Sequence, residues 1–160
     1  MTSRQPDPRS LNFAGDVDEH DQPLPMTVEV LQARTAKWPM STNTPYDVAG
    51  LLARSRQMFI DGYYTYENFM DAATRSLQAV EAALRVRFDA DKKVDFFKLI
   101  ERARDEGLAD AATHDILHTG RQLRNSQIHA TRQAVVTPVI AANIIRTSHL
   151  LVAEVFDKQP

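Results

Sequence analysis

The segment YENFMDAATRSLQAVEAALRVRF, residues 66–88, decides the fold class of this chain. Its apolar side chains recur at intervals of three and four residues, which is the spacing of one face of an α-helix. They are Tyr66, Met70, Ala73, Leu77, Val80, Leu84 and Phe88. The pattern predicts one long helix over residues 66–89, on the order of 36 Å in length at about 1.5 Å per residue.

Helical signals continue on both sides of this segment. Thr44-Pro45 and Thr137-Pro138 each combine a hydroxyl cap with a proline at the first helical position. They predict helices over about 46–61 and from 138 to about 156, while two more are expected over 94–106 and 110–130. The 94–106 helix should place Phe96, Phe97, Ile100 and Ala103 inward and stop at Gly107, and the 110–130 helix could loosen at Gly120. No window alternates convincingly with period two, so we predict an all-α, up-and-down bundle of four to five helices over residues 45–157.

Residues 1–44 differ in composition from the rest of the chain. Residues 1–25 hold five acids, two arginines and four prolines, a composition that offers little apolar surface to bury. We therefore expect a mobile acidic arm there. Residues 26–44 form a transition in which MTVEVLQARTAKW is a short helix or a strand that ends before Pro39.

Composition narrows the functional class. A chain of 160 residues is of ordinary size for one domain, and it has no cysteine for disulfides, thiolate metal sites or a thiol nucleophile. The start lacks the apolar core of a signal peptide, and no apolar run approaches the roughly 20 residues of a membrane helix. We expect a cytoplasmic protein without membrane contact. The net charge is −2, so any basic site must be local.

The predicted helix over 110–130 carries the residues best suited to chemistry. At 100° per residue, six basic or polar side chains fall within an arc of about 80°. They are His114, His118, Arg121, Asn125, His129 and Arg132. A solvated polar face is the simple alternative, although the absence of an acid from the set favours a binding surface.

Arg124 lies outside this face, on the apolar side of the same helix. A buried arginine is costly unless a carboxylate pairs with it. Glu81 lies one turn beyond Leu77, at the edge of the apolar stripe of the long helix. We therefore predict a structural ion pair between Glu81 and Arg124.

The segment His114-Asp115-Ile116-Leu117-His118 is similar to the helical metalloprotease motif, because histidines four residues apart share a helix face. Aspartate replaces the general-base glutamate, however, and no third ligand follows at a familiar interval. We predict no metal and no cofactor.

The segments LIERARDEGL (99–108) and ILHTGRQLRNSQIHA (116–130) resemble the C-terminal half of HEPN domains, small all-α modules of many prokaryotic toxins and defence proteins. Their signature is an arginine, usually followed by a polar residue, and then a histidine. Here it reads Arg124-Asn125-Ser126-Gln127-Ile128-His129. The helix SLQAVEAALRVRF is also similar to the one that precedes the signature, with Glu81 in the usual acidic position, and the resemblance covers about residues 50–155.

The resemblance implies a metal-independent endoribonuclease of toxin or phage-defence type, with RNA and an antitoxin as partners. In this reading Arg124 and His129 are catalytic and Asn125 supports them, while Arg121, Arg132 and His118 bind substrate. The family's signature residues meet across a dimer, so a homodimer with a composite site is expected. Arg124 and His129 are about 140° apart on an ideal helix, so the helix must deform, the arginine must reach across, or the second chain must complete the site. A non-catalytic module that binds RNA or a partner protein, and a plain dimeric scaffold, are the alternatives.

The last predicted helix has more apolar residues than one inward face needs. Ile140, Ile144, Leu151 and Val155 follow one face, whereas Val139, Ile145, Leu150 and Phe156 spread beyond it. Such a helix must be covered on more than one side. A two-fold homodimer would cover it, and a helix buried centrally by its own chain is the alternative.

Overall fold

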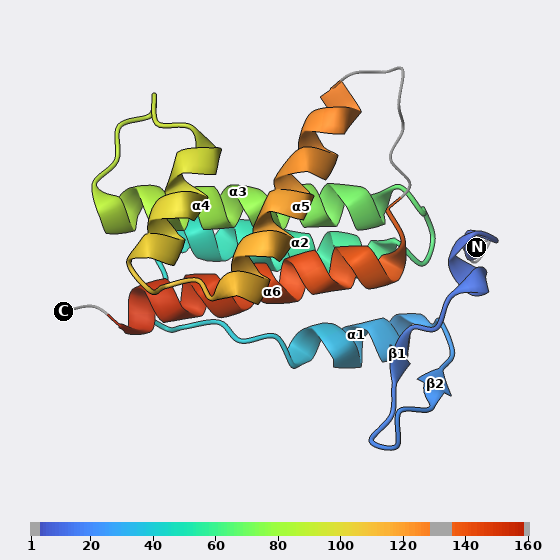
Figure 1. Cartoon of the computed structure of the whole chain (residues 1–160). Helices are drawn as coiled ribbons and strands as arrows, with labels where there is room; N and C mark the ends of the chain where they lie inside the picture. Colours follow the sequence, from blue (N-terminus) through green and yellow to red (C-terminus); the bar gives the residue numbers. More distant parts are fainter. Residues whose placement is uncertain (1–3, 129–135, 159–160) are drawn as a thin grey trace.

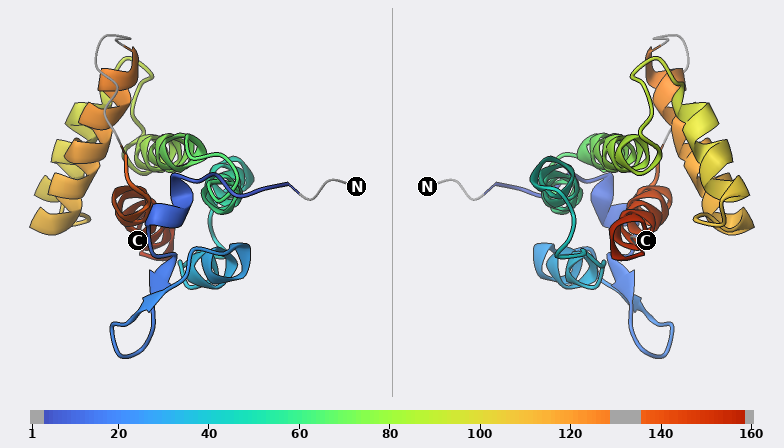
Figure 2. Two further views of the ribbon diagram at one scale, coloured as in Figure 1. Left: turned by 90° about the vertical axis from the view of Figure 1, so that its right-hand side faces the viewer. Right: turned by 90° about the vertical axis from the view of Figure 1, so that its left-hand side faces the viewer.

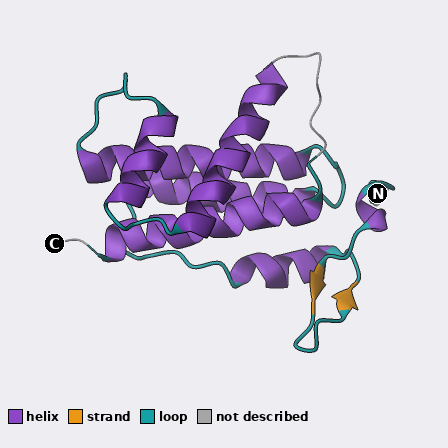
Figure 3. Ribbon diagram, viewed as in Figure 1, coloured by secondary structure: helices purple, strands orange, loops and turns teal. Residues whose placement is uncertain are grey.

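The structure is a computed structural model, and it describes residues 4–128 and 136–158, without the side chains of residues 127 and 128. Six α-helices and one minimal hairpin make up the described part (Figures 1 and 3). The helices are α1 (Val28–Ala36), α2 (Tyr46–Asp61), α3 (Asn68–Phe88), α4 (Phe96–Asp105), α5 (Ala111–Ile128) and α6 (Pro138–Asp157). The hairpin pairs β1 (Asp16–Val17) with β2 (Pro23–Leu24) in antiparallel fashion, and a short 3-10 turn covers Ser10–Asn12. The all-α prediction is confirmed.

The helices α2, α3 and α6 form the centre of the bundle, and α4 and α5 pack beside them as a helical hairpin (Figure 2). Figure 1 shows α4 and α5 crossing α3 and α6 at a steep angle, so this pair departs from a simple up-and-down arrangement. The helix α1 lies against α2 on another side of the centre. The steep crossing leaves one face of the α4–α5 pair away from the core, and the candidate site is on this pair.

The helix α6 is one of the three helices at the centre of the bundle. Thirteen of its residues are buried, among them Ile145 and Phe156, which the sequence analysis had assigned to surplus apolar surface. Val139, Ile140 and Leu150 are the large apolar residues of α6 that stay exposed. The chain itself covers two of the four residues from which a dimer was argued and leaves Val139 and Leu150 exposed, so the dimer stays a prediction.

The expectation of a protein without membrane contact stays a prediction. Among the described residues, one helix is long and apolar enough to cross a membrane by length and composition: α6, of whose apolar stretch 67% is buried inside the bundle. A core helix meets the same criteria because burial on all sides selects the same residues.

The two Thr-Pro segments behave differently. The Thr137 hydroxyl accepts a hydrogen bond from the Ile140 amide, and Pro138 takes the first helical position, as predicted. Thr44 does not cap α2, because Pro45 is the residue that precedes the helix and no side chain caps it. Gly107 has a φ of 74° after α4, which is the left-handed conformation expected of a glycine stop.

Residues 4–25 are held against the bundle by specific contacts, which differs from the expected mobile arm. In residues 4–25, the Asp7 amide donates to the Tyr63 carbonyl at 2.9 Å, and the buried Ser10 hydroxyl donates to the Gly62 carbonyl at 2.7 Å. Arg9 also bridges Asp7 and Glu67. Met26, Leu31 and Trp38 are part of the hydrophobic core, so the packed unit begins well before residue 45. Specific polar contacts order this segment where its composition offers little apolar surface.

Candidate site on helices α4 and α5

Local sequence positions α5 on the bundle. Asp110 accepts a hydrogen bond from the Thr113 amide at 2.7 Å and thereby caps the start of the helix. Gly120 lies where α5 crosses its neighbours: a Cβ there would lie 3.0 Å from the Leu77 side chain and 3.4 Å from that of Ile144. The helix continues through Gly120 without a break, so the predicted loosening is absent. Glycine here allows α5 to pack closely on α3 and α6.

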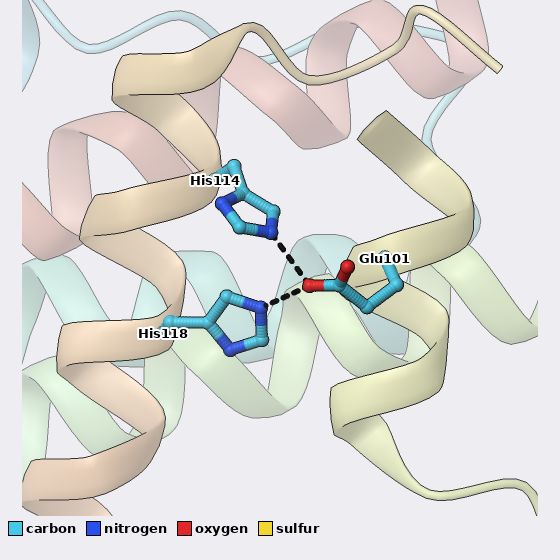
Figure 4. A group of neighbouring side chains, drawn as sticks. All are labelled: Glu101, His114 and His118. Atoms are coloured by element: carbon cyan, nitrogen blue, oxygen red, sulfur yellow. Dashed lines mark hydrogen bonds and ion pairs between the residues drawn. The ribbon is translucent and has the colours of Figure 1, made fainter. Parts of the chain in front are cut away.

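A carboxylate and two imidazoles converge between α4 and α5 (Figure 4). Glu101 Oε1 lies 2.6 Å from His114 Nε2 and 2.7 Å from His118 Nε2. The two imidazole rings, one helical turn apart on α5, are 4.5 Å apart between centroids. Both histidine side chains are largely buried, whereas that of Glu101 is 39% exposed. We call these three residues the Glu101 cluster.

The contacts define where the protons of the Glu101 cluster lie. Both Nε2 atoms face the same carboxylate oxygen, so each must carry the hydrogen that it donates. The hydrogen bond to Glu101 raises the pKa of His114, and Asp115, 3.2 Å from its Nδ1, acts in the same direction. Hydrogen bonds from His114 and His118 lower the pKa of Glu101. The cluster therefore favours an ionised carboxylate beside a charged His114.

Arg121 and Phe97 lie beside the Glu101 cluster. Arg121 Nε donates to His118 Nδ1 at 3.3 Å, and its guanidinium carbon is 5.2 Å from the Phe97 ring centroid. Phe97 also contacts the His118 ring and is 47% exposed. This corrects the prediction that Phe97 points inward: Phe96, Leu99, Ile100 and Ala103 fill the buried face of α4. Phe97, about 100° from Phe96 on the helix, falls outside that stripe.

The structure brings Glu81 and Arg124 together between α3 and α5. Arg124 Nη1 lies 3.3 Å from Glu81 Oε2, and each side chain is 24% exposed. Arg85 donates to the other oxygen of the same carboxylate at 2.7 Å. The Arg124 guanidinium carbon is 5.2 Å from the Phe96 ring centroid. Two arginines thus share one carboxylate, and the group keeps an excess of one positive charge.

The remaining predicted site residues are distributed as follows. Asn125 is exposed on α5, next to Arg124. His129 and Arg132 lie outside the described residues, and their position relative to Arg124 stays a prediction. Of the six residues assigned to the polar face, His114, His118 and Arg121 contact one another or the Glu101 carboxylate.

Glu101 is the residue that the sequence analysis missed. It precedes His114 by thirteen residues and lies on another helix, whereas a third ligand was sought after the histidines. One signal in the sequence could have identified Glu101. It lies on α4 next to the inward residue Ile100, and after a short turn α4 is followed by the helix that carries the two histidines.

We expect Glu81→Ala to lower the free energy of unfolding by about 1–2 kcal/mol, between the values for exposed and for buried pairs. The change leaves Arg85 and Arg124 without their shared carboxylate. Urea unfolding followed by circular dichroism measures the effect. Glu19→Ala, in the exposed hairpin turn, is the control and should change stability by less than about 0.5 kcal/mol. Equal, small effects from the two changes would show that the pair contributes nothing.

The chain was compared with known protein families, curated proteins and solved structures. No family model, curated protein or solved structure matches it.

Proposed function

We propose that this chain is a metal-independent endoribonuclease of the HEPN type, which cleaves RNA by attack of a ribose 2′-hydroxyl on the adjacent phosphate. The signature Arg124-Asn125-Ser126-Gln127-Ile128-His129 and the helical bundle around it support the proposal. By the same resemblance, RNA is the substrate, the protein acts in the cytoplasm as a toxin or in phage defence, and an antitoxin is its protein partner.

The observation that carries the proposal is the charge around Arg124. Glu81 is shared between Arg85 and Arg124, so one carboxylate cannot neutralise both guanidinium groups. Its contact with Arg124 uses Nη1, and a guanidinium has five N–H groups in a planar fork. Arg124 is partly exposed, is held in place and keeps positive charge that Glu81 does not fully neutralise. Such an arginine can stabilise a phosphate that gains negative charge in the transition state.

The chemistry assigns a role to each signature residue. A histidine side chain can transfer a proton near neutral pH, which is the role of His129 in this proposal, and Arg124 stabilises the phosphorane oxygens. Asn125 orients the phosphate or the histidine. The reaction needs a base at the 2′-hydroxyl and an acid at the leaving 5′-oxygen. A homodimer supplies the two histidines that these roles require.

The face beside the Glu101 cluster suits substrate binding. Phe97 offers an exposed ring on which a base can stack, and Arg121 lies over that ring. By the same resemblance, Arg121, Arg132 and His118 bind the substrate. Both ring nitrogens of His118 are engaged in the structure, by Glu101 and by Arg121, so Arg121 must move away before His118 can contact RNA. RNA would follow α5 from this face towards Arg124.

The test is incubation of end-labelled RNA with the protein in the presence of a chelator. We expect cleavage products that end in a 2′,3′-cyclic phosphate. His129→Ala should lower the rate by at least about 100-fold, because a general acid or base typically contributes that much or more.

His20→Ala is the matched control, since His20 is exposed in the hairpin turn and the change should leave the rate unaltered. Intact RNA with the unchanged protein, or equal cleavage by the His129→Ala variant, would overturn the proposal.

One observation favours a second candidate, a non-catalytic module that binds RNA or a protein. Arg124 is held by Glu81 and packs over Phe96, which is also the environment of an arginine with a structural role. This candidate predicts RNA binding without cleavage in the same assay.

A further inference from the structure

The Glu101 cluster holds three groups of the kinds that bind a transition metal. One ring nitrogen of His114, one of His118 and a Glu101 carboxylate oxygen all lie within 4.8 Å of one another. Two imidazoles and a carboxylate form a donor set that suits Zn²⁺ and related ions, whereas Mg²⁺ and Ca²⁺ prefer oxygen ligands alone. From this convergence we infer that Glu101, His114 and His118 form a binding site for one Zn²⁺ ion. The inference is independent of the proposed ribonuclease activity.

The backbone already fixes the two nitrogen ligands. His114 and His118 are four residues apart on α5 and share a face, as metal-binding histidine pairs on helices do. Both side chains are largely buried, which restricts their rotamers before the ion arrives. The entropy lost on binding is therefore smaller than for two surface histidines.

The third ligand can adjust to the ion. The present Glu101–histidine distances of 2.6 and 2.7 Å correspond to hydrogen bonds. Ligand atoms around a tetrahedral Zn²⁺ are about 3.4 Å apart, given metal–ligand distances near 2.1 Å. The carboxylate must withdraw by roughly 0.8 Å. Glu101 is partly exposed and its side chain can make this change, with the ion taking the place of the two donated hydrogens.

Asp115 favours ion binding at the Glu101 cluster, whereas Arg121 opposes it. When Nε2 binds the ion, Nδ1 carries the hydrogen, and His114 Nδ1 already lies 3.2 Å from an Asp115 oxygen that can accept it. A carboxylate behind a histidine ligand orients the ring and strengthens binding. At His118, Arg121 Nε faces Nδ1 as a donor, so Arg121 must turn away when the ion binds. The site therefore links ion binding to the position of Arg121.

Three protein ligands leave a fourth tetrahedral position for water or another ligand. The ion also adds two positive charges to the face that carries Arg121 and Phe97. The His118 assignment changes accordingly: it is a metal ligand when zinc is present and a candidate RNA contact when it is not.

The experiment titrates Zn²⁺ into the chelator-stripped, full-length protein against a chromophoric competitor, with no RNA present. We expect one ion per chain in the unchanged protein and in His20→Ala. Affinity should fall at least about tenfold in His114→Ala, since even groups behind the ligands change metal affinity by that factor or more.

Glu101→Gln keeps the size of the side chain and removes its charge, so it tests the site if His114→Ala fails to fold. It should weaken binding to a similar extent. Thermal unfolding gives a second readout, because an ion that binds only the folded state raises Tm. Absence of binding to the unchanged protein, or equal affinity in Glu101→Gln, would overturn the inference.

Discussion

Leu117→Ala is expected to lower the free energy of unfolding by about 2–5 kcal/mol, the range for removal of a fully buried leucine side chain. Leu117 is completely buried on α5, between the turns that carry His114 and His118. The cavity would form where α5 packs on α3, α4 and α6. Denaturant unfolding measures the loss.

Leu150→Ala is the matched control for this substitution. Leu150 is a helical leucine of α6 that remains exposed, and its truncation should change stability by no more than about 0.5 kcal/mol. Similar losses from the two changes would contradict the packing of α5 in the core.

The second large effect concerns pH and His149. This histidine is fully buried on α6, its Nδ1–H donates to the Pro39 carbonyl at 2.9 Å, and its Nε2 accepts from Arg56 Nε at 3.4 Å. Burial lowers the pKa of His149 from 6.5 to about 4. Above pH 6.5 the histidine is neutral in both states, and below it the unfolded chain takes up the proton first. Stability is therefore lost as the pH falls from 6.5 to 4.

We expect His149 to account for a loss of about 2–3 kcal/mol between pH 7 and pH 4.5, because each pKa unit corresponds to about 1.4 kcal/mol. The measurement is urea unfolding at both pH values for the unchanged protein and for His149→Gln. The difference between their pH dependences isolates His149 from other groups, including His114, whose raised pKa acts in the opposite direction. An identical pH dependence in the two proteins would contradict a neutral, buried His149.

The helices from α2 onward could be predicted because their signals are local. The stripe from Tyr66 to Phe88 predicted a helix over 66–89, and the observed helix is Asn68–Phe88. Gly107 and the Thr137-Pro138 pair also mark helix ends through their own conformational preferences. Such preferences act within a few residues and need no knowledge of the tertiary fold.

The N-terminal segment could not be predicted from composition. Its order depends on pairings across the chain: Arg9 with Glu67, and Ser10 with the Gly62 carbonyl. Polar residues and prolines lower the apolar surface that is available for burial. Composition does not show which residues form such specific pairs. The prediction of a mobile arm was wrong because it used the average composition of the segment and not its specific contacts.

The parts of the candidate site that depend on local helix geometry could also be predicted from the sequence. The histidines on one face of α5 follow from helix geometry, and the Glu81–Arg124 pair follows from two residues at the edges of apolar stripes. Glu101 joins the site only through the packing of α4 on α5. That packing depends on tertiary contacts that helical periodicity does not specify.

Cleavage of RNA through its own 2′-hydroxyl is tested most directly with two labelled RNAs of one sequence, unmodified and 2′-O-methylated at every ribose. The chelator-treated, full-length protein is incubated with each. We predict that the unmodified RNA is cut and the methylated RNA stays intact, because methylation removes the attacking hydroxyl. Cleavage of both RNAs, or of neither, would contradict the proposed function.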